Sequence, residues 1–175
     1  MTGTPHPERA ADLLEALRAY RPARQALLEI LGLPLSNRDP FAELSEQFVQ
    51  ALWGGTLADS RVQSGHDLVS LDGLKVQVRY LANSSSVWVN EHRVYSIPGV
   101  ALYALVLIEA FAIVGVLVFP TDDLAPICSV LGKRHPQQDQ QLQFTRRNWW
   151  AIRDDPDRFR ALGMRVWLPR LVAEH

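Results

Sequence analysis

Hydrophobic residues follow helical spacing in the first third of the chain and strand-like alternation further on. Apolar positions recur every three or four residues over residues 7–20 and again over residues 22–31, which predicts two successive helices separated by a proline. A third helix is predicted over residues 40–53, because Asp39 supplies an N-cap carboxylate before a proline and Gly54 follows the last apolar position.

The third predicted helix has a polar side that allows two interpretations. In the first, Glu43, Glu46 and Gln50 lie three and four residues apart and simply face solvent. In the second, one glutamate faces the segment that follows the helix and joins a functional site, and Glu46 is the first choice. The apolar stripe predicted for the same helix consists of Phe41, Leu44, Phe48 and Leu52.

The sequence GHDLVSLDGLKVQVRY, which follows this helix, predicts a β-hairpin. In its second strand, Val76 and Val78 point to one face, whereas Gln77 and Arg79 point to the other. A glycine-containing turn folds Asp67 back beside Gln77 and Arg79. The hairpin therefore gathers a carboxylate, an amide oxygen and a cation, a combination that can hold a divalent metal against a phosphate.

The longest apolar run, residues 100–119, has about the length that spans a bilayer, roughly 20 residues. Three features favour two strands instead. Glu109 lies near the centre of the run, where a charge costs about 2.5–3.5 kcal/mol in a membrane. Valine and isoleucine are dense, and the Glu109-Ala110-Phe111 step divides the run into two pieces of strand length. We predict two adjacent buried strands and no membrane contact.

The remaining pattern predicts short helices and strands, and therefore an α/β fold in which helices flank a mixed sheet. We expect a helical extension over residues 1–38 and an α/β core over residues 39–175, within a single domain overall. The further predicted elements are strands at 87–95, 142–144 and 165–168, and helices at 122–131, 146–152 and around 154–162.

Composition narrows the functional classes. Of the 175 residues, 47% are hydrophobic and 21% charged, which is ordinary for a soluble globular protein. The single cysteine, Cys128, excludes an intramolecular disulfide and a cysteine-rich zinc site. The polar N-terminal segment lacks the apolar centre of a signal peptide, so a cytoplasmic location is expected.

The net charge of −1 argues against a broad basic surface of the kind most DNA-binding domains carry. Two local clusters remain as candidate DNA contacts. Lys133 and Arg134 form the first, and Arg146 and Arg147 form the second. The alternative interpretation of either cluster is an ordinary solvated surface.

Asp67, Gln77 and Arg79 in this hairpin resemble the core motif of the PD-(D/E)xK nuclease superfamily. That motif has an aspartate at the start of a hairpin, then an acid, any residue and lysine on the next strand. The later segments WVNEH, LGKRHP and FTRRNWW look like those of small bacterial proteins with this core. Gln77 stands in the place of the acid and Arg79 in the place of the lysine, which makes this a QxR variant of the motif.

The resemblance implies a restriction-endonuclease-like fold and a metal-dependent DNA endonuclease that acts as a homodimer. A restriction or defence system is the role that such an enzyme would have. It implies Mg²⁺ or Mn²⁺ held by Asp67, Gln77, the Val78 carbonyl and Glu46, with Arg79 stabilising charge during phosphodiester hydrolysis. The glutamine and arginine leave a second function open, namely a catalytically inactive nuclease-like module that binds DNA or a protein.

Overall fold

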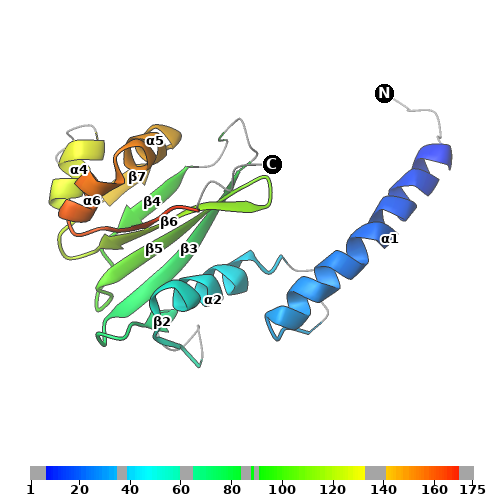
Figure 1. Ribbon diagram of the computed structural model, residues 1–175, viewed down its shortest axis with the longest axis horizontal. Helices are drawn as coiled ribbons and strands as arrows, with labels where there is room; N and C mark the ends of the chain where they lie inside the picture. Colours follow the sequence, from blue (N-terminus) through cyan, green and yellow to red (C-terminus); the bar gives the residue numbers. More distant parts are fainter. Residues whose placement is uncertain are drawn as a thin grey trace. The chain divides into compact units, whose positions relative to one another are not determined.

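Two units make up the chain, Met1–Glu43 and Leu44–His175, whereas the sequence placed a boundary after residue 38. The protein is described here from a computed structural model (Figure 1). The residues that the structure describes are 7–34, 39–59, 65–83, 88, 91–132 and 141–169.

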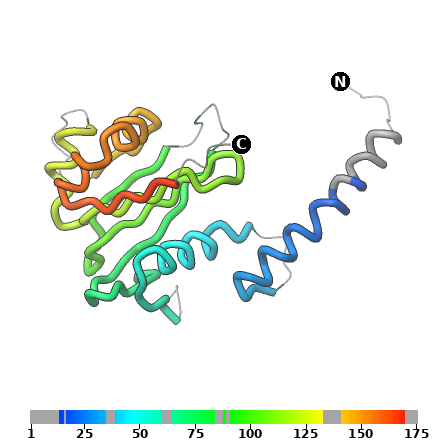
Figure 2. Tube along the Cα trace, in the orientation of Figure 1, coloured from blue at the N-terminus to red at the C-terminus, as the bar shows by residue number. Residues whose placement is uncertain are grey.

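The first unit contains a single long helix, α1 (Pro7–Ile30), shown in blue in Figure 2. The prediction of two helices was wrong, because Pro22 lies inside α1. A proline removes one backbone hydrogen bond, and the alanine, leucine, arginine and glutamine residues around it are strong helix formers. The helix ends at Ile30, one residue before the predicted end, and Gly32, with a φ of 66°, allows Leu33 N to donate to Leu28 O at 2.9 Å.

Helix α2 (Phe41–Trp53) has the predicted ends but a different buried face. Asp39 Oδ1 accepts a hydrogen bond from Phe41 N at 3.0 Å, and Gly54, with a φ of 73°, follows the last helical residue. Its fully buried residues are Ser45, Glu46 and Val49, whereas the predicted apolar stripe is only half-buried. The buried side of α2 is therefore centred on Ser45, Glu46 and Val49 and not on the predicted stripe.

The second unit is built on a mixed six-stranded sheet, as the sequence predicted for its fold class. The strand order is β1-β2-β3-β5-β6-β8, and every neighbouring pair is antiparallel except β3 and β5, which are parallel. The strands are β1 (Thr56–Leu57), β2 (Leu68–Val69), β3 (Lys75–Asn83), β5 (Leu102–Glu109), β6 (Ala112–Pro120) and β8 (Arg165–Trp167). Strands β4 (His92–Tyr95) and β7 (Gln141–Phe144) form a separate antiparallel pair.

The apolar run at residues 100–119 forms two paired strands, which confirms the prediction. Strands β5 and β6 pair from Leu102 opposite Pro120 to Glu109 opposite Ala112. The tight turn between them places Ala110 and Phe111 at positive φ, 47° and 65°, a conformation that two-residue hairpins use and that glycine or asparagine adopts more readily. Within the described residues, no helix is both long and apolar enough to cross a membrane.

Short helices cover the face of the sheet that carries the main core. They are α4 (Ala125–Leu131), α5 (Arg146–Asp154) and α6 (Pro156–Ala161). Helix α4 starts later than predicted, because Pro126 is tolerated only in a first helical turn. Asp155 caps α6, as expected, by accepting from Arg158 N at 3.3 Å. Side chains from α5, α6 and β7 pack with Tyr103, Leu105 and other residues of β5 and β6.

Candidate functional site

The predicted hairpin is present, and Asp67 is the residue immediately before its first strand. Asp67 N donates to Val76 O at 3.0 Å, and the next residue, Leu68, pairs with Val76 across β2 and β3. The turn between the strands is closed by Ser70 N, which donates to Leu74 O at 2.9 Å. The register of this hairpin therefore sets Asp67 beside the segment that carries Gln77, Val78 and Arg79.

One oxygen of Asp67 collects the polar contacts of the hairpin. Asp67 Oδ2 accepts hydrogen bonds from Val78 N at 2.7 Å, from Arg79 Nη1 at 3.2 Å and from Gln77 Nε2. Asp67 and Gln77 are each only 6% exposed. The carboxylate thus supplies the acceptor for the backbone N–H of Val78, which lies beyond the residues of β3 that pair with β2. It also satisfies the buried amide of Gln77.

Arg79 completes this cluster by contacting two oxygens with a single nitrogen. Its Nη1 lies 2.8 Å from Val78 O and 3.2 Å from Asp67 Oδ2. The Arg79 side chain is 49% exposed, whereas that of Asp67 is 7% exposed. Among the described residues, Nε and Nη2 of Arg79 have no hydrogen-bond partner. One nitrogen of the guanidinium is therefore held by the hairpin, while the side chain as a whole is half-exposed.

A histidine and two tyrosines lie in contact with one another, and the Arg79 charge acts on two of them, His92 and Tyr103. Tyr103 lies opposite Gln77 in the register of β3 and β5, and its hydroxyl lies 2.6 Å from His92 Nε2. The ring centroids of Tyr103 and Tyr95 are 6.0 Å apart. Burial lowers the pKa of His92, and the nearby Arg79 charge lowers it further, so the imidazole is kept neutral near pH 7. Burial raises the pKa of the Tyr103 hydroxyl, which stays protonated.

Sequence reasoning did not place Tyr103 in this cluster. Its register opposite Gln77 depends on the parallel pairing of β3 with β5. Parallel strands are joined by long connections, so nothing local in the sequence fixes which residues meet. The only signal was weak: Tyr103 is the single hydroxyl-bearing residue in the apolar strand Leu102–Glu109.

The donor set of this cluster does not fit a divalent metal ion. Magnesium prefers several hard oxygen ligands, with one or two carboxylates among them. Here Asp67 Oδ2 is engaged by three donors, Gln77 directs its NH₂ group rather than its oxygen at Asp67, and the Val78 carbonyl accepts from Arg79. In the part of the chain that the structure describes, no group of three or more histidine, cysteine, aspartate or glutamate residues could hold a metal.

Glu46, the glutamate expected to complete a metal site, is 7% exposed, so the solvent-facing interpretation of this residue was wrong. It belongs to α2, whose Phe48 packs edge-on against Trp167 of β8 at 5.2 Å. The neighbouring Val166 lies in the same core cluster as Tyr103, and successive residues of a strand point to opposite faces. Helix α2 therefore lies across the sheet from Tyr103, and the hydrogen bonds that Asp67 accepts come from the hairpin itself.

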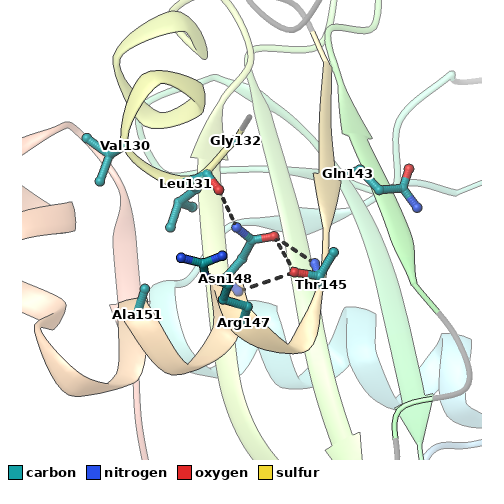
Figure 3. Close-up of a pocket in the computed structure, with 8 residues that line it drawn as sticks. All are labelled: Val130, Leu131, Gly132, Gln143, Thr145, Arg147, Asn148 and Ala151. Atoms are coloured by element: carbon teal, nitrogen blue, oxygen red, sulfur yellow. Dashed lines mark hydrogen bonds between the residues drawn. The ribbon is translucent and has the colours of Figure 1, made fainter. Parts of the chain in front are cut away.

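The two expected DNA contacts that the structure describes, Arg146 and Arg147, lie on α5. The Arg146 guanidinium carbon stacks 4.6 Å from the ring centroid of Trp150. Arg147 is exposed and lines a cavity of about 490 Å³ between α4, β7 and α5 (Figure 3). The other expected contacts, Lys133 and Arg134, lie outside the described residues. The cavity is lined by Val130, Leu131, Gly132, Gln143, Thr145, Arg147, Asn148 and Ala151.

The walls of this cavity are tied together by Asn148, which is 5% exposed. Its Nδ2 donates to Leu131 O at 2.7 Å, and its Oδ1 accepts from Thr145 N at 2.8 Å (Figure 3). The bond from Thr145 N, together with Asn148 N donating to Thr145 Oγ1 at 3.4 Å, forms the capping box of α5, and the bond to Leu131 O holds the start of α5 against the end of α4. The polar groups of Asn148 are therefore satisfied within the protein. Their role at this cavity is to hold the start of α5 against the end of α4.

No family model matches the chain, and no curated protein matches its sequence.

Proposed function

We propose that this protein is a nuclease-like module of the PD-(D/E)xK type that binds DNA without cutting it. The resemblance of Asp67, Gln77 and Arg79 to the superfamily motif supports the nuclease-like part of the proposal. The mixed sheet with helices, and the hairpin that brings these residues together, are in keeping with a restriction-endonuclease-like fold.

The observation that carries the proposal is the position of Arg79 Nη1, 2.8 Å from the Val78 carbonyl and 3.2 Å from Asp67 Oδ2. These are two of the oxygens that the resemblance assigns to a metal. Phosphodiester hydrolysis of this kind needs a metal that activates water and stabilises negative charge. A guanidinium supplies positive charge but stays protonated, so it cannot generate the nucleophile.

The exposure of the Arg79 side chain, 49%, supports binding to a phosphate backbone. Its Nε and Nη2 groups can contact phosphate oxygens in the paired geometry that arginine favours. Tyr95 is 41% exposed, and its ring lies beside Tyr103 in the same cluster, so it offers an aromatic surface for a base or sugar.

The second candidate is the Mg²⁺- or Mn²⁺-dependent DNA endonuclease that the resemblance implies. One observation favours it: Asp67, Gln77 and Val78 lie together, as the motif requires. For this candidate to hold, Arg79 has to leave the two oxygens that it contacts. A homodimer is part of the same implication, and sedimentation equilibrium tests it directly.

Supercoiled plasmid separates the two candidates. Wild-type protein is incubated with plasmid and Mg²⁺ or Mn²⁺, and both nicking and gel retention are followed over a series of salt concentrations. We expect retention that weakens as salt rises, without nicking. Arg79→Gln should weaken retention and flatten its salt dependence, whereas Arg158→Gln, a matched change at an exposed arginine of α6, should not.

Two outcomes oppose the proposal in different ways. Metal-dependent nicking that disappears in Asp67→Asn would replace it by the endonuclease. Absence of retention for wild-type protein at low salt would reject DNA as the partner.

A further inference from the structure

We propose that the Arg79 guanidinium is a built-in cation that takes the place of a divalent ion between Asp67 and the Val78 carbonyl. This inference deepens the proposed function, because it gives the reason for the missing cleavage. It does not depend on DNA, since it concerns the free protein alone.

The geometry is that of one positive group shared by two oxygens. Nη1 lies at hydrogen-bond distance from both Val78 O and Asp67 Oδ2. A buried carboxylate and a backbone carbonyl directed at one point create a strongly negative position, and a buried charge needs a compensating partner there. Arg79 provides this partner from within the hairpin.

The position of Gln77 agrees with a cation that belongs to the protein. A glutamate in its place would add a second negative charge beside the buried Asp67. Two neighbouring carboxylates can both stay ionised only if additional positive charge lies close to them. Gln77 instead donates from Nε2 to Asp67 Oδ2. The cluster thus contains one negative and one positive side chain, Asp67 and Arg79, and balances its own charge.

The chain contains a second arginine–aspartate pair that serves as a control. Arg165 Nη2 lies 3.3 Å from Asp72 Oδ2, almost the same distance as in the Arg79–Asp67 pair. The Asp72 side chain is 70% exposed, whereas that of Asp67 is 7% exposed. Solvent compensates the exposed aspartate when its arginine is removed, so only the buried pair should require a replacement cation.

The test replaces Arg79 by methionine, which keeps an unbranched apolar side chain of similar reach and removes the charge. Binding of Mn²⁺ to metal-free protein is measured from the free-ion signal in electron paramagnetic resonance, together with thermal unfolding in EDTA and in Mn²⁺. Wild-type protein and Arg165→Met are measured beside it, and so is Arg79→Met combined with Asp67→Asn.

We expect Arg79→Met to have a lower melting temperature than wild type in EDTA and to recover part of the loss in Mn²⁺. Its Mn²⁺ affinity should exceed that of wild type on the order of tenfold, because a like charge about 4 Å from the ion has been removed. Arg165→Met should behave as wild type with Mn²⁺, and the additional Asp67→Asn change should abolish the gain.

Two results would overturn the inference. One is Mn²⁺ binding by wild-type protein as tight as that of Arg79→Met, because the guanidinium would then not occupy the position. The other is Arg79→Met that folds but neither binds Mn²⁺ nor loses stability in EDTA. Either result can occur whether or not the wild-type protein retains plasmid, so it is distinguishable from failure of the DNA-binding proposal.

Discussion

Replacement of Asp67 distinguishes a carboxylate that holds the hairpin together from one that is kept for a metal. The perturbation is Asp67→Ala, measured with Asp67→Asn in EDTA. In the alanine variant, Val78 N–H and the Gln77 amide lose their common acceptor, and both residues are buried. The Arg79 guanidinium also loses a partner, but it is half-exposed and water can replace the carboxylate there.

The size of the effect follows from these contacts. A buried N–H group left without an acceptor costs about 1–3 kcal/mol. The ion pair adds only about 0–1 kcal/mol, because solvent screens the exposed arginine. Asp67→Ala leaves two such groups without an acceptor, so we expect it to lower the free energy of unfolding by about 2–6 kcal/mol. Asp67→Asn keeps an oxygen for Val78 N, so its loss should be nearer 1 kcal/mol.

The assay is urea unfolding followed by tryptophan fluorescence, with EDTA present throughout. Asp72→Ala is the control, because Asp72 is an exposed partner of Arg165, and its effect should stay within about 0.5 kcal/mol. An Asp67→Ala variant that is as stable as wild type, or more stable, would show that the carboxylate does not hold the hairpin together. That is the behaviour expected of a metal-binding carboxylate, whose removal relieves an uncompensated charge in metal-free protein.

Three further predictions concern the surroundings of the site and the core. The folded-state pKa of His92 lies below 6.5, so the unfolded chain binds more protons than the folded chain between that pKa and 6.5. The free energy of unfolding should therefore fall as pH drops through this window. In His92→Gln, the free energy of unfolding should depend less on pH over the same window. A Cβ added at Gly115 would lie 2.5 Å from the ring of Trp149, so Gly115→Ala should cost about 1–3 kcal/mol in urea unfolding. Phe111 has a φ of 65° and is 87% exposed. Phe111→Gly should therefore raise the free energy of unfolding by up to about 1 kcal/mol, seen as a higher melting temperature.

Local patterns predicted the hairpin and the β5–β6 pair correctly because the signals for both lie within a few residues. Alternation around Val76 and Val78, followed back through a glycine turn, fixes the register of Asp67. Dense valine and isoleucine, interrupted at Glu109, are sufficient to divide an apolar run into two strands.

The remaining features depend on contacts that sequence spacing does not record. Pro22 was expected to end a helix, but one missing hydrogen bond does not outweigh strong helix formers on both sides. The buried position of Glu46 depends on which side of α2 meets the sheet. The bridging position of Arg79 depends on one side-chain rotamer, and the residue type alone allowed several roles for it.

A crystal structure of the wild-type protein soaked in Mn²⁺, with anomalous scattering recorded, shows whether Arg79 or a metal ion lies between Asp67 and the Val78 carbonyl. We expect Arg79 Nη1 between Asp67 Oδ2 and the Val78 carbonyl, and no anomalous peak at that position. A manganese ion bound to Asp67 and the Val78 carbonyl, with the Arg79 side chain turned away, would contradict this expectation.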